Sequence, residues 1–198
     1  MASPRGPDFQ TFIAAIAGHL AARDIPFMLI GGQAVLLHGR PRVTEDVDVT
    51  LGVGPDGWGR IRDVCADLAL DPLPEHVEAF VRETFVLPAR HAETGMRVDF
   101  IFSTTPYERQ AIDRAIRVDV VGVAVPFATA EDLIIHKLFA GRPRDLEDAV
   151  GVLRRRGAEL DWRYLEHWVA EFARVPGREE LARRLADLRR EAGGSETG

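Results

Sequence analysis

The sequence contains a single cysteine, Cys65, and this scarcity excludes two kinds of site. One cysteine cannot form an internal disulfide, and it cannot build a zinc site that needs several cysteines. The six histidines have no paired metal-ligand spacing, so a histidine-based metal site is not indicated either. Cys65 stands among apolar residues at helical spacing, which predicts a buried helical position rather than a nucleophile.

The N-terminal segment does not have the pattern of a secretory signal. Residues 12–22 have the apolar length of a signal-peptide core, but they follow Arg5 and Asp8 instead of a basic flank. We therefore expect an amphipathic helix in this segment, a cytoplasmic location and no membrane partner. No internal repeat or low-complexity tract is present.

Lysine is as scarce as cysteine, because Lys137 is the only lysine among 25 basic residues. Arginine is a planar fork, whereas lysine is a compact charge on a flexible stem, so a site close to phosphate oxygens could require the lysine. Lys137 follows Leu133 and Ile134 at helical spacing, which places its stem on or beside an apolar face. Two interpretations stay open: Lys137 contacts a triphosphate, or it is a snorkelling residue that was retained by chance.

Residues 44–52 have the pattern of a strand with one polar face. Thr44, Asp46 and Asp48 alternate with valines, so their side chains project from the same side. Two carboxylates on one face repel each other, and a shared Mg²⁺ or Mn²⁺ would remove that conflict through hard oxygen ligands. The alternative is a solvated strand end with a chance Asp-x-Asp.

A glycine pair, Gly31-Gly32, stands between a short apolar strand pattern at 26–30 and a helical pattern that begins at Gln33. Glycine lets backbone amides approach phosphate oxygens, and a helix N-terminus offers free N–H groups at the positive end of its dipole. A glycine pair alone is more often a simple turn. The aspartate pair downstream is what favours a phosphate site here.

These motifs together resemble the minimal nucleotidyltransferases of the DNA polymerase β superfamily, and in particular the abortive-infection (AbiEii-like) toxin branch. That branch carries Gly-Gly-x-Ala, Arg-x-Thr-x-Asp-x-Asp and Glu-Asp-Leu-x-x-x-Lys, which here are residues 31–34, 42–48 and 131–137. The resemblance covers about residues 8–155. It implies a metal-dependent enzyme that moves a nucleoside monophosphate from an NTP to an acceptor and releases pyrophosphate.

The resemblance also implies a third carboxylate on a neighbouring strand. Asp99, in the apolar run 96–102, is the first candidate, Asp119 is its rival, and a buried Arg97–Asp99 ion pair is the structural alternative. Asp145 could orient Lys137, although acidic residues are favoured near helix N-termini in any case. The implied catalytic and metal-binding residues are Asp46, Asp48 and Asp99, and the implied nucleotide-binding residues are Gly31, Gly32, Arg42, Thr44 and Lys137.

The order of the expected elements indicates an α+β (α/β-like) fold with a mixed sheet flanked by helices. Strands are expected at 26–30, 44–52, 84–91, 96–102 and 116–127, the last bent into a hairpin at Gly122, and the chain is helical from residue 129 onward. We place a nucleotidyltransferase core at 8–128, a helical C-terminal extension at 129–192, and disordered ends at 1–7 and 193–198.

The acceptor is the least determined part of this interpretation. Residues 1–140 hold 13 basic and 19 acidic side chains, a net charge of −6, which is poorly suited to gripping RNA phosphates. Arginines nevertheless cluster at 154–156, 183–184 and 189–190, where the alternative is a solvated surface paired with neighbouring acids. We expect a toxin-like enzyme with RNA, such as tRNA ends, as its acceptor, and an antitoxin protein as a further candidate partner. The alternatives are an aminoglycoside-like small-molecule acceptor and a catalytically silent nucleotide-binding or antitoxin-like protein.

Overall fold

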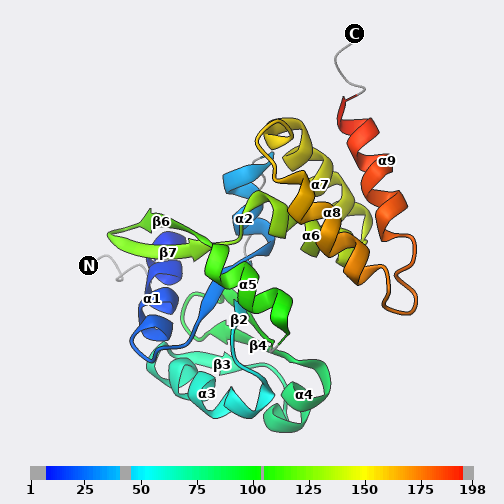
Figure 1. Ribbon diagram of the computed structural model, residues 1–198. Coiled ribbons are helices and arrows are strands. Elements are labelled where there is room, and N and C mark those ends of the chain that lie inside the picture. Colours follow the sequence, from blue (N-terminus) through cyan, green and yellow to red (C-terminus); the bar gives the residue numbers. More distant parts are fainter. Residues whose placement is uncertain (1–7, 41–45, 104, 194–198) are drawn as a thin grey trace. The chain divides into compact units, whose positions relative to one another are not determined.

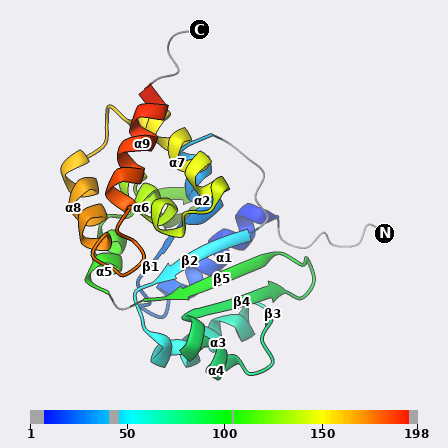
Figure 2. The same cartoon turned by 90° about the vertical axis from the view of Figure 1, so that its right-hand side faces the viewer.

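Seven strands form one mixed sheet in the described part of the chain, which confirms the expected α+β fold. The computed structural model describes residues 8–40, 46–103 and 105–193, so the predictions for residues 1–7 and 194–198 lie outside it. The strands are β1 (Phe27–Leu29), β2 (Asp46–Leu51), β3 (Leu70–Pro72), β4 (Val86–His91), β5 (Arg97–Phe102), β6 (Ile116–Val120) and β7 (Val123–Phe127). Their order in the sheet is β3-β4-β5-β2-β1-β7-β6. The β6–β7 end can be followed in Figure 1, and β1 to β5 are labelled in Figure 2. β2 with β5 and β1 with β7 run parallel, and the other neighbours run antiparallel.

The chain divides into two compact units. The sheet unit contains all the strands with α1 (Phe9–Ala21), the 3₁₀ turn η1 (Pro55–Gly57), α3 (Trp58–Asp67), α4 (Val77–Thr84) and α5 (Pro106–Arg114). The helical unit contains α2 (Gly31–His38), α6 (Ala130–Ala140), α7 (Pro143–Arg156), α8 (Trp162–Phe172) and α9 (Leu181–Gly193). None of the helices described is long and apolar enough to cross a membrane.

The helical unit differs from the expected C-terminal extension because it includes α2. This helix packs against α6 and α7, and glycine makes the approach close. A Cβ atom on Gly39 would lie 3.1 Å from Cγ2 of Val152, tighter than almost all real contacts of that kind. At the other end of the unit, α9 continues to Gly193, one residue beyond the expected extension.

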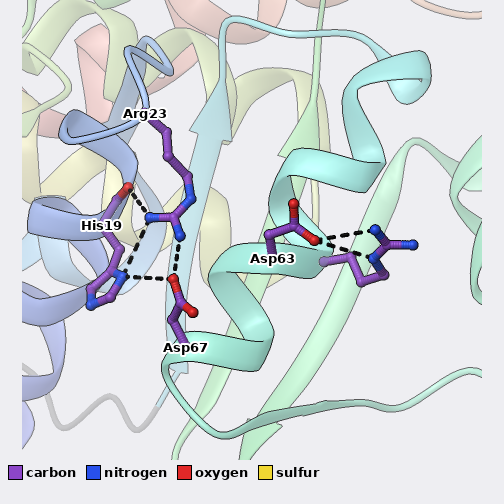
Figure 3. A network of polar contacts seen from close by, with 5 residues as sticks. His19, Arg23, Asp63 and Asp67 are labelled. Atoms are coloured by element: carbon purple, nitrogen blue, oxygen red, sulfur yellow. Dashed lines mark hydrogen bonds and ion pairs between the residues drawn. The ribbon is translucent and has the colours of Figure 1, made fainter.

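Polar contacts link the C-terminal ends of α1 and α3 within the sheet unit (Figure 3). Arg23 pairs with Asp67, and Nδ1 of His19 lies 3.5 Å from Oδ2 of the same aspartate. Arg23 also donates to the backbone carbonyl of His19 at 3.2 Å. Because Asp67 is 44% exposed, such pairs contribute at most about 1 kcal/mol, and they fix geometry more than stability. Cys65, on the buried side of α3, is 2% exposed, which confirms its predicted helical core position.

The sequence did not indicate β3. The expected strands leave out residues 70–72, and two prolines, Pro72 and Pro74, stand close together in this part of the sequence. Pro72 instead pairs with Ala89 of β4, at the outer edge of the sheet. An edge strand is hydrogen-bonded on one side only, so it tolerates a residue that has no N–H group.

β6 and β7 form the hairpin that was expected to bend at Gly122. Val121 and Gly122 make the turn with φ angles of +52° and +80°, which are typical of a two-residue type I′ turn. Glycine adopts positive φ without strain, but a β-branched residue does so rarely. The hairpin therefore carries local strain at Val121.

We expect Val121→Asn to raise the free energy of unfolding by about 1 kcal/mol, because asparagine tolerates the left-handed region that valine resists. Val121 is 59% exposed, so the change removes little packing. Urea unfolding measures the effect, and Val175→Asn is the control because Val175 is also exposed, at 41%, but has no positive φ. Equal or lower stability of the Val121 variant would show that the turn is not strained.

Candidate active site

Asp46 and Asp48 project from one face of β2. Val47 and Val49 between and after them are fully buried, whereas Asp46 is exposed and Asp48 is half-buried. The alternation of polar and buried side chains agrees with the period of two expected for this strand. Val43 and Thr44, which were expected to continue the pattern, lie outside the described residues, as does Arg42.

Asp99 lies beside this pair. β5 lies beside β2 and runs parallel to it (Figure 2). Asp48 and Asp99 are register partners in these two strands. Neighbouring strands are about 4.8 Å apart, and partners in register point to the same face. Asp119 lies on the edge strand β6, separated from β2 by β1 and β7. Of the two rival carboxylates, Asp99 is the one on a strand next to β2 and on the same face of the sheet as Asp48.

The carboxyl of Asp99 is in an environment that disfavours its charge. Burial raises the pKa of Asp99, Arg97 opposes this in part, and the charge of Asp46 adds to it. Arg97 Nη2 lies 3.7 Å from Oδ1 of Asp99, an ion pair too long to be a hydrogen bond. Oδ1 is buried and accepts no hydrogen bond from the described residues. The Arg97–Asp99 pair is thus present, but it leaves a buried acceptor that a cation or a substrate proton could satisfy.

We expect Asp99→Asn to stabilise the protein at pH 7. A raised pKa in the folded state means that ionisation favours the unfolded chain, so wild-type stability falls as the pH rises through that pKa. The asparagine variant lacks this loss, and its advantage should shrink below about pH 4, where the carboxyl is protonated in both states. Thermal unfolding from acid to neutral pH tests this, with the exposed Asp71→Asn as control. A variant less stable than wild type at pH 7 would contradict this assignment.

The donor chemistry of the three aspartates fits a hard divalent cation. Among the described residues, however, no group of three or more histidine, cysteine, aspartate or glutamate side chains is close enough to hold an ion alone. Mg²⁺ in nucleotide enzymes is commonly held by one or two carboxylates, with substrate phosphates and water completing its shell. The orphaned Oδ1 of Asp99 and the neighbouring Asp48 fit that arrangement better than a closed protein cage.

The glycine pair opens α2. Gly31 has a φ of +62°, a conformation that favours glycine, and α2 continues from there to His38. Gln33, in the first turn, is 6% exposed, and its Nε2 has no hydrogen-bond partner among the described residues. The first N–H groups of a helix also lack intrahelical acceptors. This helix start therefore concentrates donors, which is the chemistry that binds phosphate oxygens.

Lys137 lies on α6 in a buried ionic cluster within the helical unit. Its Nζ donates to Oδ1 of Asp145 at 2.7 Å and pairs with Oδ2 of Asp148 at 2.9 Å. The three side chains are 8%, 4% and 8% exposed. Burial alone would raise the pKa of Asp145, but hydrogen bonds from Arg142 and Lys137 hold it below its ordinary value. The expected contact between Asp145 and Lys137 is thus present.

Asp148 is a partner of Lys137 that the sequence did not reveal. It stands three residues after Asp145 on α7, so the two carboxylates share one face of that helix. Helical spacing could have indicated this double acceptor. Two carboxylates fix the ammonium more firmly than one, which makes Lys137 a positioned donor and not a free snorkelling side chain.

Buried polar contacts hold α6 at its N-terminus. Asp132 is fully buried and accepts hydrogen bonds from Thr129 Oγ1 at 2.8 Å and from the hydroxyl of Tyr164 at 2.7 Å. The ring Nε2 of His38 lies 2.8 Å from the carbonyl of Ala128, and burial lowers the pKa of His38. Residues at the start of the Glu-Asp-Leu motif therefore support the helix that carries Lys137.

The clustered arginines are paired with their surroundings. Arg156 donates to Glu159 at 2.8 Å, and Arg155 donates to the carbonyl of Gly39 at 3.0 Å. Arg154 makes longer contacts to Glu191, at 3.4 Å to its carbonyl and 4.0 Å to its carboxylate. The later pairs follow the same pattern: Arg184 with Glu180, Arg190 with Asp187 and Arg189 with Glu166. The alternative of an acid-paired helix surface accounts for most of these contacts, whereas Arg155 bonds to a backbone carbonyl.

Comparison with known proteins gives similar folds. One is an antigenic nucleotidyltransferase-like protein from Paracoccidioides brasiliensis, with a TM-score of 0.59, 17% identity, and 93% of this chain and 88% of that chain covered. The antibiotic-resistance factor ANT(2'')-Ia gives 0.57 and 14%, with 86% and 96% covered. The lincosamide antibiotic adenylyltransferase LnuA gives 0.51 and 15%, with 74% and 96% covered. At such identities these likenesses show the fold alone. A search of curated proteins found no match.

The family comparison covers most of the chain. Residues 17–194 match the model of a family described as nucleotidyl transferase AbiEii toxin, type IV TA system. The match includes the aspartates of β2 and β5, the glycine pair and Lys137. The chain therefore belongs to the AbiEii nucleotidyltransferase family, and it is an NTP-dependent nucleotidyltransferase.

Proposed function

We propose that this enzyme transfers a nucleoside monophosphate from an NTP to a hydroxyl of RNA, releases pyrophosphate and requires Mg²⁺ or Mn²⁺. The observation that carries the proposal is the register of Asp48 with Asp99, with Asp46 on the same face of β2. These carboxylates would hold the cation. When bound, a divalent cation supplies charge neutralisation for the triphosphate and for the developing charge on the leaving group.

Asp99 is proposed as the base. The acceptor hydroxyl oxygen forms a bond to the α-phosphorus, and its proton passes to the carboxylate of Asp99. The bond from the α-phosphorus to the oxygen that bridges to the β-phosphate breaks, and pyrophosphate leaves with that oxygen. Burial raises the pKa of Asp99, which makes its carboxylate a stronger proton acceptor than a solvated aspartate and supports this role.

The helical unit is proposed to supply donors to the phosphates. Gly31 and Gly32 offer backbone N–H groups at the start of α2, and an ammonium group has three N–H donors, of which Asp145 and Asp148 account for two. The third N–H of Lys137 would bind a phosphate oxygen. Arg42 and Thr44 are proposed as further phosphate ligands on the strength of the family motif.

The charges of the two units differ, and this difference bears on which of the two candidate acceptors each unit could bind. The described sheet unit holds 9 basic and 16 acidic residues, whereas the described helical unit holds 14 basic and 13 acidic residues. RNA affinity comes mainly from phosphate neutralisation, so we assign RNA contacts to the helical unit. Arg40, Arg154 and Arg155 line one cavity there, of about 390 Å³. Membership of a type IV toxin–antitoxin family supports an antitoxin as a partner.

A small cationic acceptor is the second candidate, because the sheet unit carries an excess of acidic residues. The structure of ANT(2'')-Ia in complex with adenylyl-2''-tobramycin and the lincomycin-bound structure of LnuA show antibiotics at enzymes of similar fold. A catalytically silent protein is disfavoured by the presence of all three carboxylates. The acceptor must therefore be identified directly.

The test is transfer from each of the four NTPs, labelled in the α-phosphate, to total RNA and, in parallel, to a panel of aminoglycosides, lincosamides and polyamines. We expect label on RNA and none on the panel. If an antibiotic is labelled and RNA is not labelled by any NTP, the acceptor is a small molecule and not RNA.

Replacing Arg154, Arg155 and Arg156 by serine is expected to weaken RNA modification and its dependence on salt. Each lost phosphate contact should reduce the slope of log affinity against log salt by roughly 0.7, the value for single strands. Filter binding of RNA at several salt concentrations measures this. The control replaces three arginines of the sheet unit, Arg62, Arg82 and Arg109, by serine. Equal slopes in both variants would show that the arginine cluster does not contact RNA.

A further inference from the structure

β6 is one of the two edge strands of the sheet. It ends the strand order, and among the described residues its neighbour in the sheet is β7 (Figure 1). Arg117 and Asp119 are exposed, and Ile116 is 38% exposed. Val118 and Val120, on the same face as Ile116, are half-buried. An edge strand with apolar side chains is a template for a further strand.

The hairpin register shows which backbone groups face outward. Arg117 is the register partner of Pro126, which has no N–H group, so these two residues cannot exchange both backbone hydrogen bonds. A two-residue turn at Val121 and Gly122 also closes on a hydrogen-bonded pair, Val120 with Val123. Hydrogen-bonded and non-bonded pairs alternate along antiparallel strands. The N–H and C=O groups of Arg117 and Asp119 therefore point away from β7, in the plane of the sheet and beyond its edge.

This edge is complementary to itself. If a second copy of β6 lies antiparallel with the two Val118 residues opposite each other, Arg117 of each chain faces Asp119 of the other. Arg117 and Asp119 are also the residues whose backbone N–H and C=O groups point outward. The register that pairs their charges therefore also pairs their backbone hydrogen-bonding groups. On the other face, Ile116 stands opposite Val120. Opposite charges and paired apolar residues directly across strands are both stabilising.

We infer that the β6 edge is a two-fold interface between two copies of this chain, in which the sheets join edge to edge. A contact of one short strand is small compared with standard protein interfaces, so the dimer is weak and depends on concentration. Its charge pairs are isologous: each Arg117–Asp119 contact occurs twice by symmetry. The interface involves none of the residues assigned to transfer, so its test is independent of the test of the proposed function.

Charge exchange tests the interface. Arg117→Glu places like charges opposite each other in a dimer of that variant, and Asp119→Arg does the same with the opposite sign. A mixed pair of the two variants restores two attractive contacts. By sedimentation equilibrium we expect wild type to dimerise with concentration, each variant alone to lose at least about tenfold in association, and the equimolar mixture to recover it. Arg109→Glu, an equal charge change on α5, should behave as wild type.

Amide protection provides an independent readout. With increasing concentration, hydrogen exchange should slow at the amides of Arg117 and Asp119, which face outward, and stay unchanged at Val118, which already bonds to β7. A wild type that stays monomeric at the highest concentration would overturn the inference, as would a mixture no more associated than its components. Capture of a foreign strand with wild type still monomeric also overturns it.

Discussion

Asp46→Asn and Asp48→Asn are each expected to reduce nucleotide transfer by at least about 1,000-fold. Loss of a metal-binding carboxylate removes several kcal/mol of charge stabilisation, and each 1.36 kcal/mol corresponds to about a factor of ten in rate. The two side chains are exposed and half-buried, so both variants should fold. Steady-state transfer of α-label measures activity, and thermal unfolding checks the fold.

The matched control for these variants is Asp71→Asn, an exposed carboxylate on the edge strand β3 of the same sheet. It removes the same charge without touching β2 or β5, so its transfer rate should stay at the wild-type level. Excess Mg²⁺ or Mn²⁺ should partly restore a variant whose metal affinity alone is weakened. Wild-type rates in both the Asp46 and Asp48 variants would show that the two carboxylates do not hold a metal used in the reaction.

Lys137→Ala is expected to lower the free energy of unfolding by about 3–5 kcal/mol, the usual cost of removing one partner from a buried ion pair. The lysine side chain is 8% exposed and lies against two buried carboxylates, so its loss leaves charge that solvent cannot reach. Urea unfolding measures the loss. Adding Asp148→Asn to the alanine variant should recover part of it, because the neutral amide no longer needs a cation.

Lys137→Arg separates binding from stability. Arginine keeps the charge, but its larger fork cannot reproduce a point donor held by Asp145 and Asp148, so nucleotide affinity should fall by about 1–3 kcal/mol. Isothermal titration with a non-hydrolysable NTP measures the affinity. Unchanged affinity in both the arginine and alanine variants would mean that Lys137 stabilises the helical unit and does not contact the nucleotide.

The parts of the fold and site that could be predicted from the sequence are those that depend on local periodicity. Asp46 and Asp48 alternate with buried valines because the side-chain period of a strand depends only on its own residues. The buried position of Cys65 and the hairpin bend at Gly122 are also local patterns. The neighbourhood of Asp99 is not local: it requires the pairing of β2 with β5, and a resemblance to known enzymes indicated it where periodicity could not.

What the sequence did not predict depends on long-range contacts. β3 is three residues long and contains a proline, so its strand character comes from pairing with β4. The grouping of α2 with the later helices rests on close packing at Gly39 that no local pattern encodes. Asp148, the second carboxylate on Lys137, shares a helix face with Asp145, but its contact with Lys137 depends on the packing of α7 against α6. The roles of the site residues in catalysis stay predictions.

The central claim is that this chain transfers a nucleoside monophosphate, and position-specific labelling tests it most directly. Purified enzyme is incubated with Mg²⁺, total RNA and an NTP labelled in either the α- or the γ-phosphate, with the Asp46→Asn variant in parallel. The account predicts that α-label enters the acceptor, that γ-label appears in pyrophosphate, and that both events stop in the variant or in the presence of a chelator. Transfer of γ-label to the acceptor, or transfer of α-label that the variant performs at the wild-type rate, would contradict it.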